Sequence, residues 1–397
     1  MRSQFLPFSP PTVGEDEIAE VVATLRSDWI TIGPKTQLFE GQFADFIGAR
    51  STLAVSSCTG ALHLSLVALA IGPGDRVVTT PMTFCSTVHV IEHVGAEPVL
   101  VDVEPDTLNL DPAKVGEVLS GEKGSGVKAI LPVHLYGHPA DMGRLDALAK
   151  RHGIAIIEDA AHALPARHQG RLVGAHSPES SPPRLTCFSF YATKNLTTSE
   201  GGMLTGDPEL VDEARLWSLH GMSRDAWKRY DGASRWYYEV TRPGFKYNMT
   251  DLQAAMGIHQ LRKLPEFHER RKEIAQRYHE AFLEVDEVER PTERPMTDSA
   301  WHIYALRLNL DELTLSRDEF IEELRARHIG TSVHFIPVHL HSYYREKYSF
   351  RPSDFPVSFR EYQRLISLPL NTRLSDADVE DVIEAVITVV RLHRRRG

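Results

Sequence analysis

Short runs of mainly apolar residues alternate with helical patterns through the first half of the chain. The apolar runs lie at 53–57, 76–80, 98–103, 127–133 and 154–159. The helical patterns between them lie at 60–71, 84–93, 112–119 and 141–152. Continuous apolar runs are typical of parallel strands that are covered on both faces. The alternation therefore predicts an α/β fold with a mostly parallel, doubly wound sheet, which binds its ligands beyond the carboxyl ends of the strands.

The second half of the chain has longer helical patterns and fewer strands. Residues 251–263 and 266–285 predict two long helices, and a strand is predicted at 303–308. The strand is followed by further helical patterns, so this part has an α+β character. We expect a large domain over residues 1–261 and a small C-terminal α+β domain over residues 262–397.

Two helix starts in the C-terminal half have capping-box patterns. Glu319 stands three residues after Ser316, and Asp378 stands three residues after Ser375. In a capping box the two side chains bond each other's backbone N–H groups. We expect a helix to begin after each serine, and the first of these helices to end at Gly330.

Composition places the chain among soluble proteins with a sizeable core. Its 397 residues are 42% hydrophobic and 25% charged, which excludes disordered, collagen-like and disulfide-scaffold proteins. With 44 Lys and Arg against 54 Asp and Glu, the net charge is −10. A negative chain lacks the positive field that attracts nucleic acid or an anionic membrane, so we expect neither as a partner.

The cysteine count and the uncharged stretches bear on the cellular compartment. Cys58, Cys85 and Cys187 are an odd number of thiols in a long chain, which fits a reducing compartment. The first residues contain prolines where a signal peptide needs an apolar run. Residues 51–74 lack charge but contain many polar groups, and this favours a strand and helix within a core over a membrane span. We expect a cytoplasmic protein.

Lys194 has the least ordinary setting of the lysines. It is the only charged residue between Leu185 and Ser199. Strand-like apolar surroundings remove water from an amine, which lowers its pKa and favours the neutral form. A neutral lysine forms Schiff bases with aldehydes. The alternative is a lysine at a strand end that extends its charge to solvent.

Asp159 and His162 follow the strand predicted at 154–159. Spaced three apart, they face the same way if the segment begins a helical turn. A carboxylate at this sheet edge can hold a pyridine nitrogen protonated, as a pyridoxal cofactor requires to accept electrons. A plain helix N-cap is the alternative for Asp159, and the spacing alone does not decide between them.

Small residues at 56–60 stand where a strand leads into a helix. The first N–H groups of a helix and its dipole favour a phosphate, although the SSCTG sequence matches neither common phosphate-binding motif. Ser189, on the strand before Lys194, adds a hydroxyl. Phe84 follows another predicted strand and could cover one face of an aromatic ring, with core packing as its default role.

These segments together resemble the DegT/DnrJ/EryC1 family of sugar aminotransferases. The resemblance is carried by VSSCTGALHL, PMTFCSTVHVIEHVGAEPVLVDV, PVHLYGHPADM, IEDAAHA, CFSFYATKN and PGFKYNMTDLQAA, and runs in order from residue 29 to residue 370. The chain is most similar to the enzymes that aminate C4 of a nucleotide-linked 4-keto sugar, of the UDP-4-amino-4-deoxy-L-arabinose synthase type. FLPFSPP, WITIGPK, KYNMTD and YYREKY are similar to that type.

The resemblance implies a fold, a cofactor and the residues around the cofactor's ring. It implies the type I aminotransferase fold, with pyridoxal phosphate and L-glutamate as the amino donor. Lys194 matches the lysine that binds the cofactor and then moves the proton. Asp159 matches the partner of the ring nitrogen, His162 the residue beside the 3-hydroxyl, and Phe84 the stacking aromatic.

The resemblance also implies a phosphate site shared between two subunits of a homodimer. Cys58, Thr59, Gly60 and Ser189 match the phosphate cradle within one subunit. Asn248 corresponds to a residue that reaches the phosphate from the neighbouring subunit. Trp29 and His334 correspond by position to sugar-contacting residues, and packing roles are the alternative for both.

Several positions depart from the family pattern. Cys58 stands where many members have glycine, Phe84 where the arabinose-type enzymes have tryptophan, and Tyr191 where they have histidine. The loop at 177–184, which is a surface loop by composition, is longer. Tyr191 and the longer loop lie near where the sugar should bind, so these two changes concern the identity of the sugar. The cofactor assignment is kept. Lys194 argues against the dehydratase relatives, which have histidine there.

Two alternatives remain from the sequence. Amination at C3 of the sugar is one. The other comes from a different class of protein, because His89, Glu92 and His93 fit the H-x-x-E-H pattern of zinc hydrolases. A pattern with two fixed histidines is a poor discriminator in a chain with 19 of them, so we expect no metal.

Overall fold

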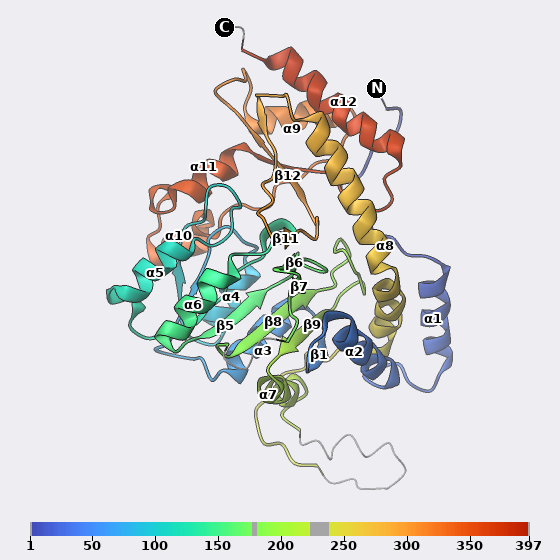
Figure 1. The fold of residues 1–397 in the computed structure, drawn as a ribbon. Helices are drawn as coiled ribbons and strands as arrows, with labels where there is room; N and C mark the ends of the chain where they lie inside the picture. Colours follow the sequence, from blue (N-terminus) through green and yellow to red (C-terminus); the bar gives the residue numbers. More distant parts are fainter. Residues whose placement is uncertain (1, 177–180, 223–237, 396–397) are drawn as a thin grey trace.

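The computed structural model describes residues 2–176, 181–222 and 238–395 (Figure 1). The helices are α1 (Glu15–Arg26), α2 (Pro34–Ile47), α3 (Cys58–Ala68), α4 (Ser86–His93), α5 (Pro112–Ser120), α6 (Met142–His152), α7 (Pro208–Ser218), α8 (Asp251–Ala281), α9 (Arg317–Ala326), α10 (Ser342–Tyr348), α11 (Pro356–Arg364) and α12 (Asp376–His393). The strands are β1 (Thr52–Val55), β2 (Arg76–Thr79), β3 (Glu97–Leu100), β4 (Val127–Ile130), β5 (Ala155–Asp159), β6 (Arg167–His168), β7 (Arg171–Leu172), β8 (Arg184–Ser189), β9 (Gly202–Gly206), β10 (Val288–Glu289), β11 (Thr297–Asp298), β12 (Tyr304–Leu308) and β13 (Leu365–Leu368).

A seven-stranded sheet forms the centre of the molecule, in the order β1-β9-β8-β5-β4-β2-β3. Strands β8, β5, β4, β2 and β3 pair in parallel, and β9 runs antiparallel between β1 and β8. This confirms the predicted α/β fold with a mostly parallel sheet. Each of the five predicted strands is present, with the observed strand ending up to three residues earlier. Helices cover both faces of the sheet (Figure 1).

Residues 51–74, uncharged in the sequence, form β1 and α3 inside the core, as predicted. The helix α3 is buried on nearly every side from Cys58 to Leu66. It packs against β8, β9 and α4. Among the described residues, no helix is both long and apolar enough to cross a membrane.

The prediction of two helices at 251–263 and 266–285 is wrong. A single helix, α8, runs from Asp251 to Ala281 with Pro265 inside it. An interior proline costs about 3 kcal/mol, but this helix is anchored at both ends. Its first half packs in one core cluster with α2, and its second half packs in another with β12 and α12. Burial at both ends therefore holds the helix together across the proline.

The C-terminal part contains the three-stranded antiparallel sheet β10-β12-β13, which packs with α8, α9 and α12 around a second core. Figure 1 shows α8 running from beside the central sheet to this second core. The predicted domain boundary at residue 261 falls within α8, and the two-domain division stays a prediction. Of the loop predicted at 177–184, residues 177–180 lie outside the described part of the chain.

The two capping boxes are confirmed. The Oγ atoms of Ser316 and Ser375 accept bonds from the backbone N–H groups of Glu319 and Asp378, at 3.3 and 3.2 Å. The predicted end of the first helix at Gly330 is wrong. Helix α9 ends at Ala326, because the chain after it turns to pair with the N-terminal arm, where Gly330 donates its N–H to the carbonyl of Leu6 at 2.8 Å.

Candidate active site

A cavity of about 470 Å³ opens beyond the carboxyl ends of β5 and β8. It lies at the sheet edge that the sequence predicted. The structure brings eight of the predicted residues together in its lining, namely Cys58, Thr59, Phe84, Asp159, His162, Ser189, Lys194 and His334. Gly60, Asn248 and Trp29 do not line it.

Lys194 sits in the turn that follows β8. Its backbone N–H donates to the carbonyl of Tyr191 at 2.9 Å, which fixes the turn and holds the side chain at the cavity. Burial lowers the pKa of Lys194 to about 8. A sizeable fraction of the amine is therefore neutral near pH 8 and can attack an aldehyde. The prediction of a desolvated lysine is confirmed in direction.

Asp159 ends β5 with its carboxylate in the cavity wall. The hydroxyl of Thr87 donates to Oδ2 at 2.8 Å, and the N–H of Ala161 donates to Oδ1 at 3.1 Å. Burial raises the pKa of Asp159, while these two bonds oppose the rise. No helix begins at this point, so the residue is not a helix N-cap. The carboxylate is held in place from two sides and faces the space beside Lys194.

His162 is also buried at the cavity. The segment after Asp159 is a turn and not part of a helix. The Nδ1 of His162 accepts the backbone N–H of Tyr136 at 3.2 Å. Burial, and then the charge of Lys194, lowers the pKa of His162 well below its usual value. The ring is therefore neutral at physiological pH, with its proton on Nε2, and it can donate one hydrogen bond to a ligand.

The first turn of α3 forms one end of the cavity. Ser57 caps the helix, and its Oγ accepts the N–H of Gly60 at 3.0 Å. The N–H of Gly60 is thus already used, which leaves the cavity-lining residues Cys58 and Thr59 to offer the first backbone N–H groups of the helix. Strand β9 passes directly behind them at Gly202, where an added Cβ would lie 2.7 Å from the Cys58 nitrogen.

Aromatic side chains line the mouth of the cavity. Phe84 is 58% exposed and Tyr191 is 48% exposed. The ring of Phe335 lies 5.9 Å from that of Phe84 and 5.7 Å from that of His162. An aromatic ring that is left open beside a cavity can cover the face of a planar ligand. Phe84 is therefore not a core residue, which was its alternative role.

Trp29 and Asn248 lie outside the cavity. Trp29 packs on Gly33 and donates its Nε1–H to the carbonyl of Ile32 at 2.6 Å. Asn248 is buried, and its Oδ1 accepts a hydrogen bond from Lys246 Nζ at 2.5 Å. Their roles in binding sugar and in reaching a second subunit stay predictions.

His334 reaches the cavity from the C-terminal part of the chain. Its Nδ1 and the Oγ of Ser367 are 2.9 Å apart, and its ring stacks on Phe8 with centroids 5.4 Å apart. Burial lowers the pKa of His334 to about 4. The cavity thus combines residues that are far apart in the sequence.

Sequence reasoning missed three residues of the site. Thr87 holds Asp159, Phe335 lies over His162, and His302 lines the cavity beside His162. A histidine directly before the predicted strand at 303–308 was a visible signal for His302. The other two residues come from a helix and a loop that only the fold places here.

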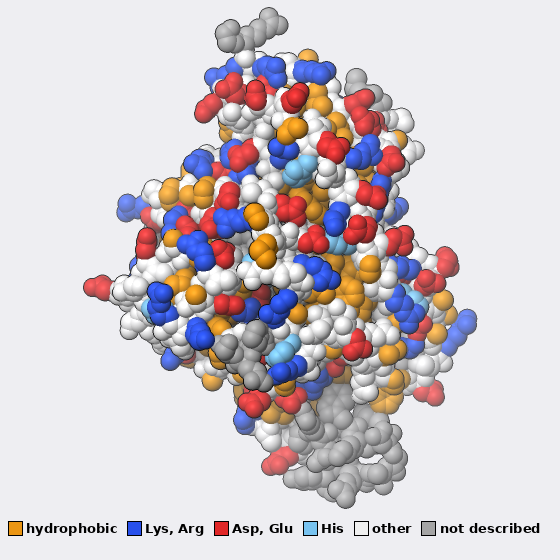
Figure 2. Space-filling model, in the orientation of Figure 1, with side chains coloured by type: hydrophobic (Ala, Val, Ile, Leu, Met, Phe, Trp, Pro, Cys, Tyr) orange, Lys and Arg blue, Asp and Glu red, His pale blue; other side chains and the backbone are white. Residues whose placement is uncertain are grey.

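The zinc-hydrolase pattern does not form a metal site. The carboxylate of Glu92 accepts bonds from Tyr343, Lys347 and Tyr348, so its oxygens are occupied by other partners. Within the described ranges, no group of three or more His, Cys, Asp or Glu side chains could hold a metal ion. The surface bears on the partners expected from the net charge. Over the face in Figure 2, acidic and basic side chains are intermixed, and neither sign forms a broad patch there.

Comparison with known proteins agrees with the family resemblance seen in the sequence. The model of the DegT/DnrJ/EryC1/StrS aminotransferase family matches residues 11–387. The chain is 48% identical over 392 residues to the spore coat polysaccharide biosynthesis protein SpsC of Bacillus subtilis, with 98% of each chain covered. Such identity over nearly the whole length covers every segment that lines the cavity.

Solved structures agree in fold. The putative sugar aminotransferase Spr1654 from Streptococcus pneumoniae, in its PLP form, has a TM-score of 0.88 and 33% identity, with 98% of this chain and 99% of that chain covered. Helicobacter pylori PseC, an aminotransferase involved in the biosynthesis of pseudoaminic acid, has a TM-score of 0.88 and 26% identity, covering 98% and 100%. These comparisons support the sugar aminotransferases in general and do not single out the arabinose type.

Proposed function

The chain belongs to the DegT/DnrJ/EryC1/StrS aminotransferase family, and we propose that it transfers the amino group of L-glutamate to C4 of a nucleotide-linked 4-keto sugar, with pyridoxal phosphate as cofactor. The observation that carries the proposal is one cavity holding a buried lysine, a buried carboxylate and a helix N-terminus. The products are 2-oxoglutarate and a 4-amino sugar nucleotide.

The cavity's chemistry fits pyridoxal phosphate, which the solved PLP form of Spr1654 contains. This cofactor supplies an aldehyde that condenses with amines and a protonated ring that accepts electrons. Lys194 would hold its aldehyde carbon, and Asp159 would hold its ring nitrogen. The N–H groups of Cys58 and Thr59, together with the hydroxyl of Ser189, would bind the phosphate. His162 would donate its Nε2–H to the 3-oxygen, and Phe84 would cover one face of the ring.

Each side chain has a task in the transfer. Lys194 Nζ, when neutral, takes a proton from the carbon that bears the amino group and returns it later, as a general base and acid. Asp159, fixed by Thr87 and Ala161, keeps its negative charge directed at one point. With a ligand bound beneath them, the aromatic rings at the cavity mouth would shield this region from water. Trp29 and His334 would contact the sugar.

The proposal includes an oligomeric state, a cellular location and an alternative reaction. Asn248 would reach the phosphate of a second subunit, which makes the enzyme a homodimer with shared active sites. We infer a cytoplasmic location, because the three free thiols Cys58, Cys85 and Cys187 suit a reducing compartment. Amination at C3 of the sugar is the alternative reaction of the same family.

The decisive experiment replaces the reactive amine. Lys194→Ala is expected to lose turnover with L-glutamate and to lose the lysine-bound absorbance of the cofactor, because no other lysine lines the described cavity. Lys150→Ala, which removes an exposed lysine of α6, serves as the matched control and should behave as the unaltered protein. Full activity in Lys194→Ala would refute the proposal.

The sugar is tested separately. The purified protein is incubated with L-glutamate and a panel of UDP- and dTDP-linked 4-keto and 3-keto sugars. Mass spectrometry of the products should show exchange of a carbonyl oxygen for an amine on a 4-keto substrate. Amination of 3-keto sugars alone would support the C3 alternative instead.

A further inference from the structure

Two neutral histidine rings lie in contact at the inner end of the cavity. His162 and His302 have ring centroids 4.5 Å apart at an angle of 45°, and both line the cavity. Each is only 7% exposed. Burial, and then the charge of Lys194, lowers the pKa of His302 well below its usual value. Neither ring is charged at physiological pH, so the position of one proton on each ring decides what it offers.

Asn195 fixes the proton of His302. The Nδ2 of Asn195 donates to the carbonyls of Leu164 and Ala300, at 3.0 and 2.7 Å. These two bonds establish which end of the amide is the NH₂ group. Its Oδ1 must then accept, and it lies 3.1 Å from Nδ1 of His302. His302 therefore has its proton on Nδ1 and a lone pair on Nε2.

The proton of His162 is on the opposite nitrogen. Its Nδ1 accepts the backbone N–H of Tyr136, so a neutral ring has its proton on Nε2. Two imidazoles joined end to end by an N–H···N bond have centroids about 5 Å apart, and the observed 4.5 Å is shorter. The rings touch by their faces and edges, and His162 keeps its N–H while His302 keeps its lone pair.

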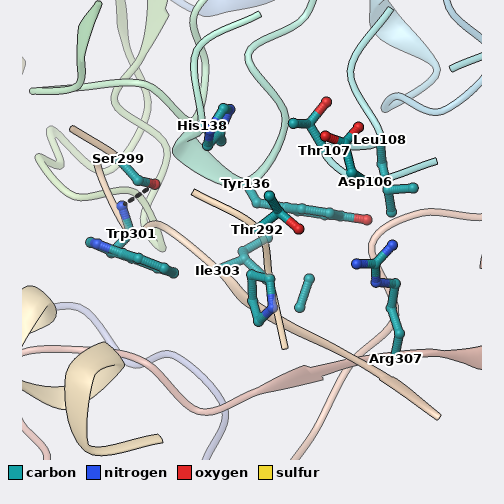
Figure 3. Close-up of a pocket in the computed structure, with 12 residues that line it drawn as sticks. Asp106, Thr107, Leu108, Tyr136, His138, Thr292, Ser299, Trp301, Ile303 and Arg307 are labelled. Carbon is teal, nitrogen blue, oxygen red and sulfur yellow. Dashed lines mark hydrogen bonds between the residues drawn. The ribbon is translucent and has the colours of Figure 1, made fainter. Parts of the chain in front are cut away.

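The backbone around His302 is held rigidly. The buried guanidinium of Arg271 donates from Nη1 to the carbonyls of Trp301, His302 and Leu370, at 3.2, 3.4 and 2.7 Å. The N–H of Trp301 donates to the Oγ of Ser299 at 3.2 Å, as Figure 3 shows beside a small neighbouring cavity. The ring of His302 is thus fixed at its backbone and at Nδ1, which leaves Nε2 as its free polar atom.

We propose that His302 is a substrate-positioning residue, whose Nε2 lone pair, set by Asn195, accepts a hydrogen bond from the amino group being transferred beside Lys194. The paired rings then offer complementary groups, a donor from His162 and an acceptor from His302. An amine brings N–H donors, which a protonated or Nε2–H imidazole would repel. The identity of the ligand rests on the proposed function. The position of the proton on His302 does not depend on it.

The ring's state is measured directly. The full-length protein, with ¹⁵N-labelled histidine, is examined by NMR at pH 7.5 before and after loading with pyridoxal phosphate. The signal of His302 is identified by its loss in His302→Gln. Protonated Nδ1 with unprotonated Nε2 is the expected result. A proton on Nε2, or on both nitrogens, overturns the inference, whatever the enzyme's reaction proves to be.

A pair of variants tests the positioning role. The amide of Gln reaches the place of Nε2 and provides an oxygen acceptor there, whereas that of Asn reaches only the place of Nδ1. His302→Asn should lower kcat/KM for L-glutamate about 10–100-fold, as expected for a bond to a charged group, and His302→Gln should restore most of it. Equal losses in both variants would overturn the positioning role.

His268 provides the matched control. It is a buried histidine whose Nε2 lies 2.9 Å from the carbonyl of Ser299, in the same segment, and it does not line the cavity. His268→Gln should keep the kcat/KM of the unaltered protein, and a loss as large as that of His302→Asn would assign both effects to the segment and overturn the proposal. If the unaltered protein transfers no amine from L-glutamate, the proposed function fails, and the NMR result still decides the state of His302.

Discussion

Gly202 provides a quantitative test of the proposed phosphate site at the start of α3. In Gly202→Ala the new Cβ would lie 2.7 Å from the nitrogen of Cys58 and 2.8 Å from the carbonyl oxygen of Phe188. Ordinary contact begins at 3.4 Å, so the backbones must separate by about 0.7 Å, the difference between 3.4 and 2.7 Å. The atoms are backbone atoms on both sides and cannot rotate away. Overpacking of this kind costs about 1–3 kcal/mol.

The separation must also move the helix N–H groups that we assign to the phosphate. Strand β9 is fixed between β1 and β8, so the start of α3 moves more easily than the strand. A loss of about 1.4 kcal/mol in cofactor binding corresponds to a tenfold higher Kd. We expect Gly202→Ala to lower the free energy of unfolding by about 2 kcal/mol and to weaken pyridoxal phosphate binding about tenfold.

Two measurements check this prediction. Urea unfolding of the cofactor-free protein gives the stability, and quenching of tryptophan fluorescence gives the Kd for pyridoxal phosphate. The matched control is Gly41→Ala in α2, where an added Cβ meets nothing within 4 Å. This control should gain about 0.5–1 kcal/mol and keep its Kd. A Gly202→Ala protein with unchanged stability and unchanged Kd would refute the reasoning.

Three further predictions concern charge. Because burial brings the pKa of Lys194 to about 8, the rate of Schiff-base formation with pyridoxal phosphate should rise with pH to a midpoint near 8; a midpoint near 10, the ordinary value, would contradict this. Asp159→Asn should still bind the cofactor but lose kcat about 10²–10³-fold, measured at saturating L-glutamate. Burial would raise the pKa of Glu158, but Arg184 and His134 bring it to about 2. Its stabilising effect is thus present above the ordinary pKa of about 4.3 and is lost as the pH falls towards 2. Unfolding in urea should show the unaltered protein losing more stability below pH 4 than Glu158→Gln, and parallel losses would disprove the assignment.

The sequence was sufficient where local patterns set the structure. Continuous apolar runs predicted β1 to β5 because strands covered on both faces leave no polar face, and the serine pairs predicted the starts of α9 and α12 because capping is local. Local sequence patterns gave wrong predictions where packing between distant parts of the chain decided the structure. Pro265 indicated a break between two helices, but two cores hold α8 together across it.

Some residues of the candidate site were likewise predictable from local sequence, and others were not. Asp159 and the turn at 58–60 were recognisable because each lies at the end of a predicted strand, and the carboxyl ends of parallel strands meet at one edge. Lys194 was recognisable as the only charged residue between Leu185 and Ser199. The resemblance to a family added roles for these residues, which the spacing alone left open. His89, Glu92 and His93 show the limit of motifs, since only the fold brings Tyr343 and Tyr348 onto that glutamate.

Only the tertiary structure decided which atoms of the buried polar groups donate hydrogen bonds and which accept them. The sequence shows that Asn195 and His302 are present, but a proton's position on an imidazole depends on which atom its neighbour presents. That neighbour is fixed by two carbonyls, of Leu164 and Ala300, which come from opposite parts of the chain. Burial then removes the water that could exchange these roles. The sequence alone thus determined the fold class and singled out Lys194, and tertiary packing determined the donors and acceptors around it.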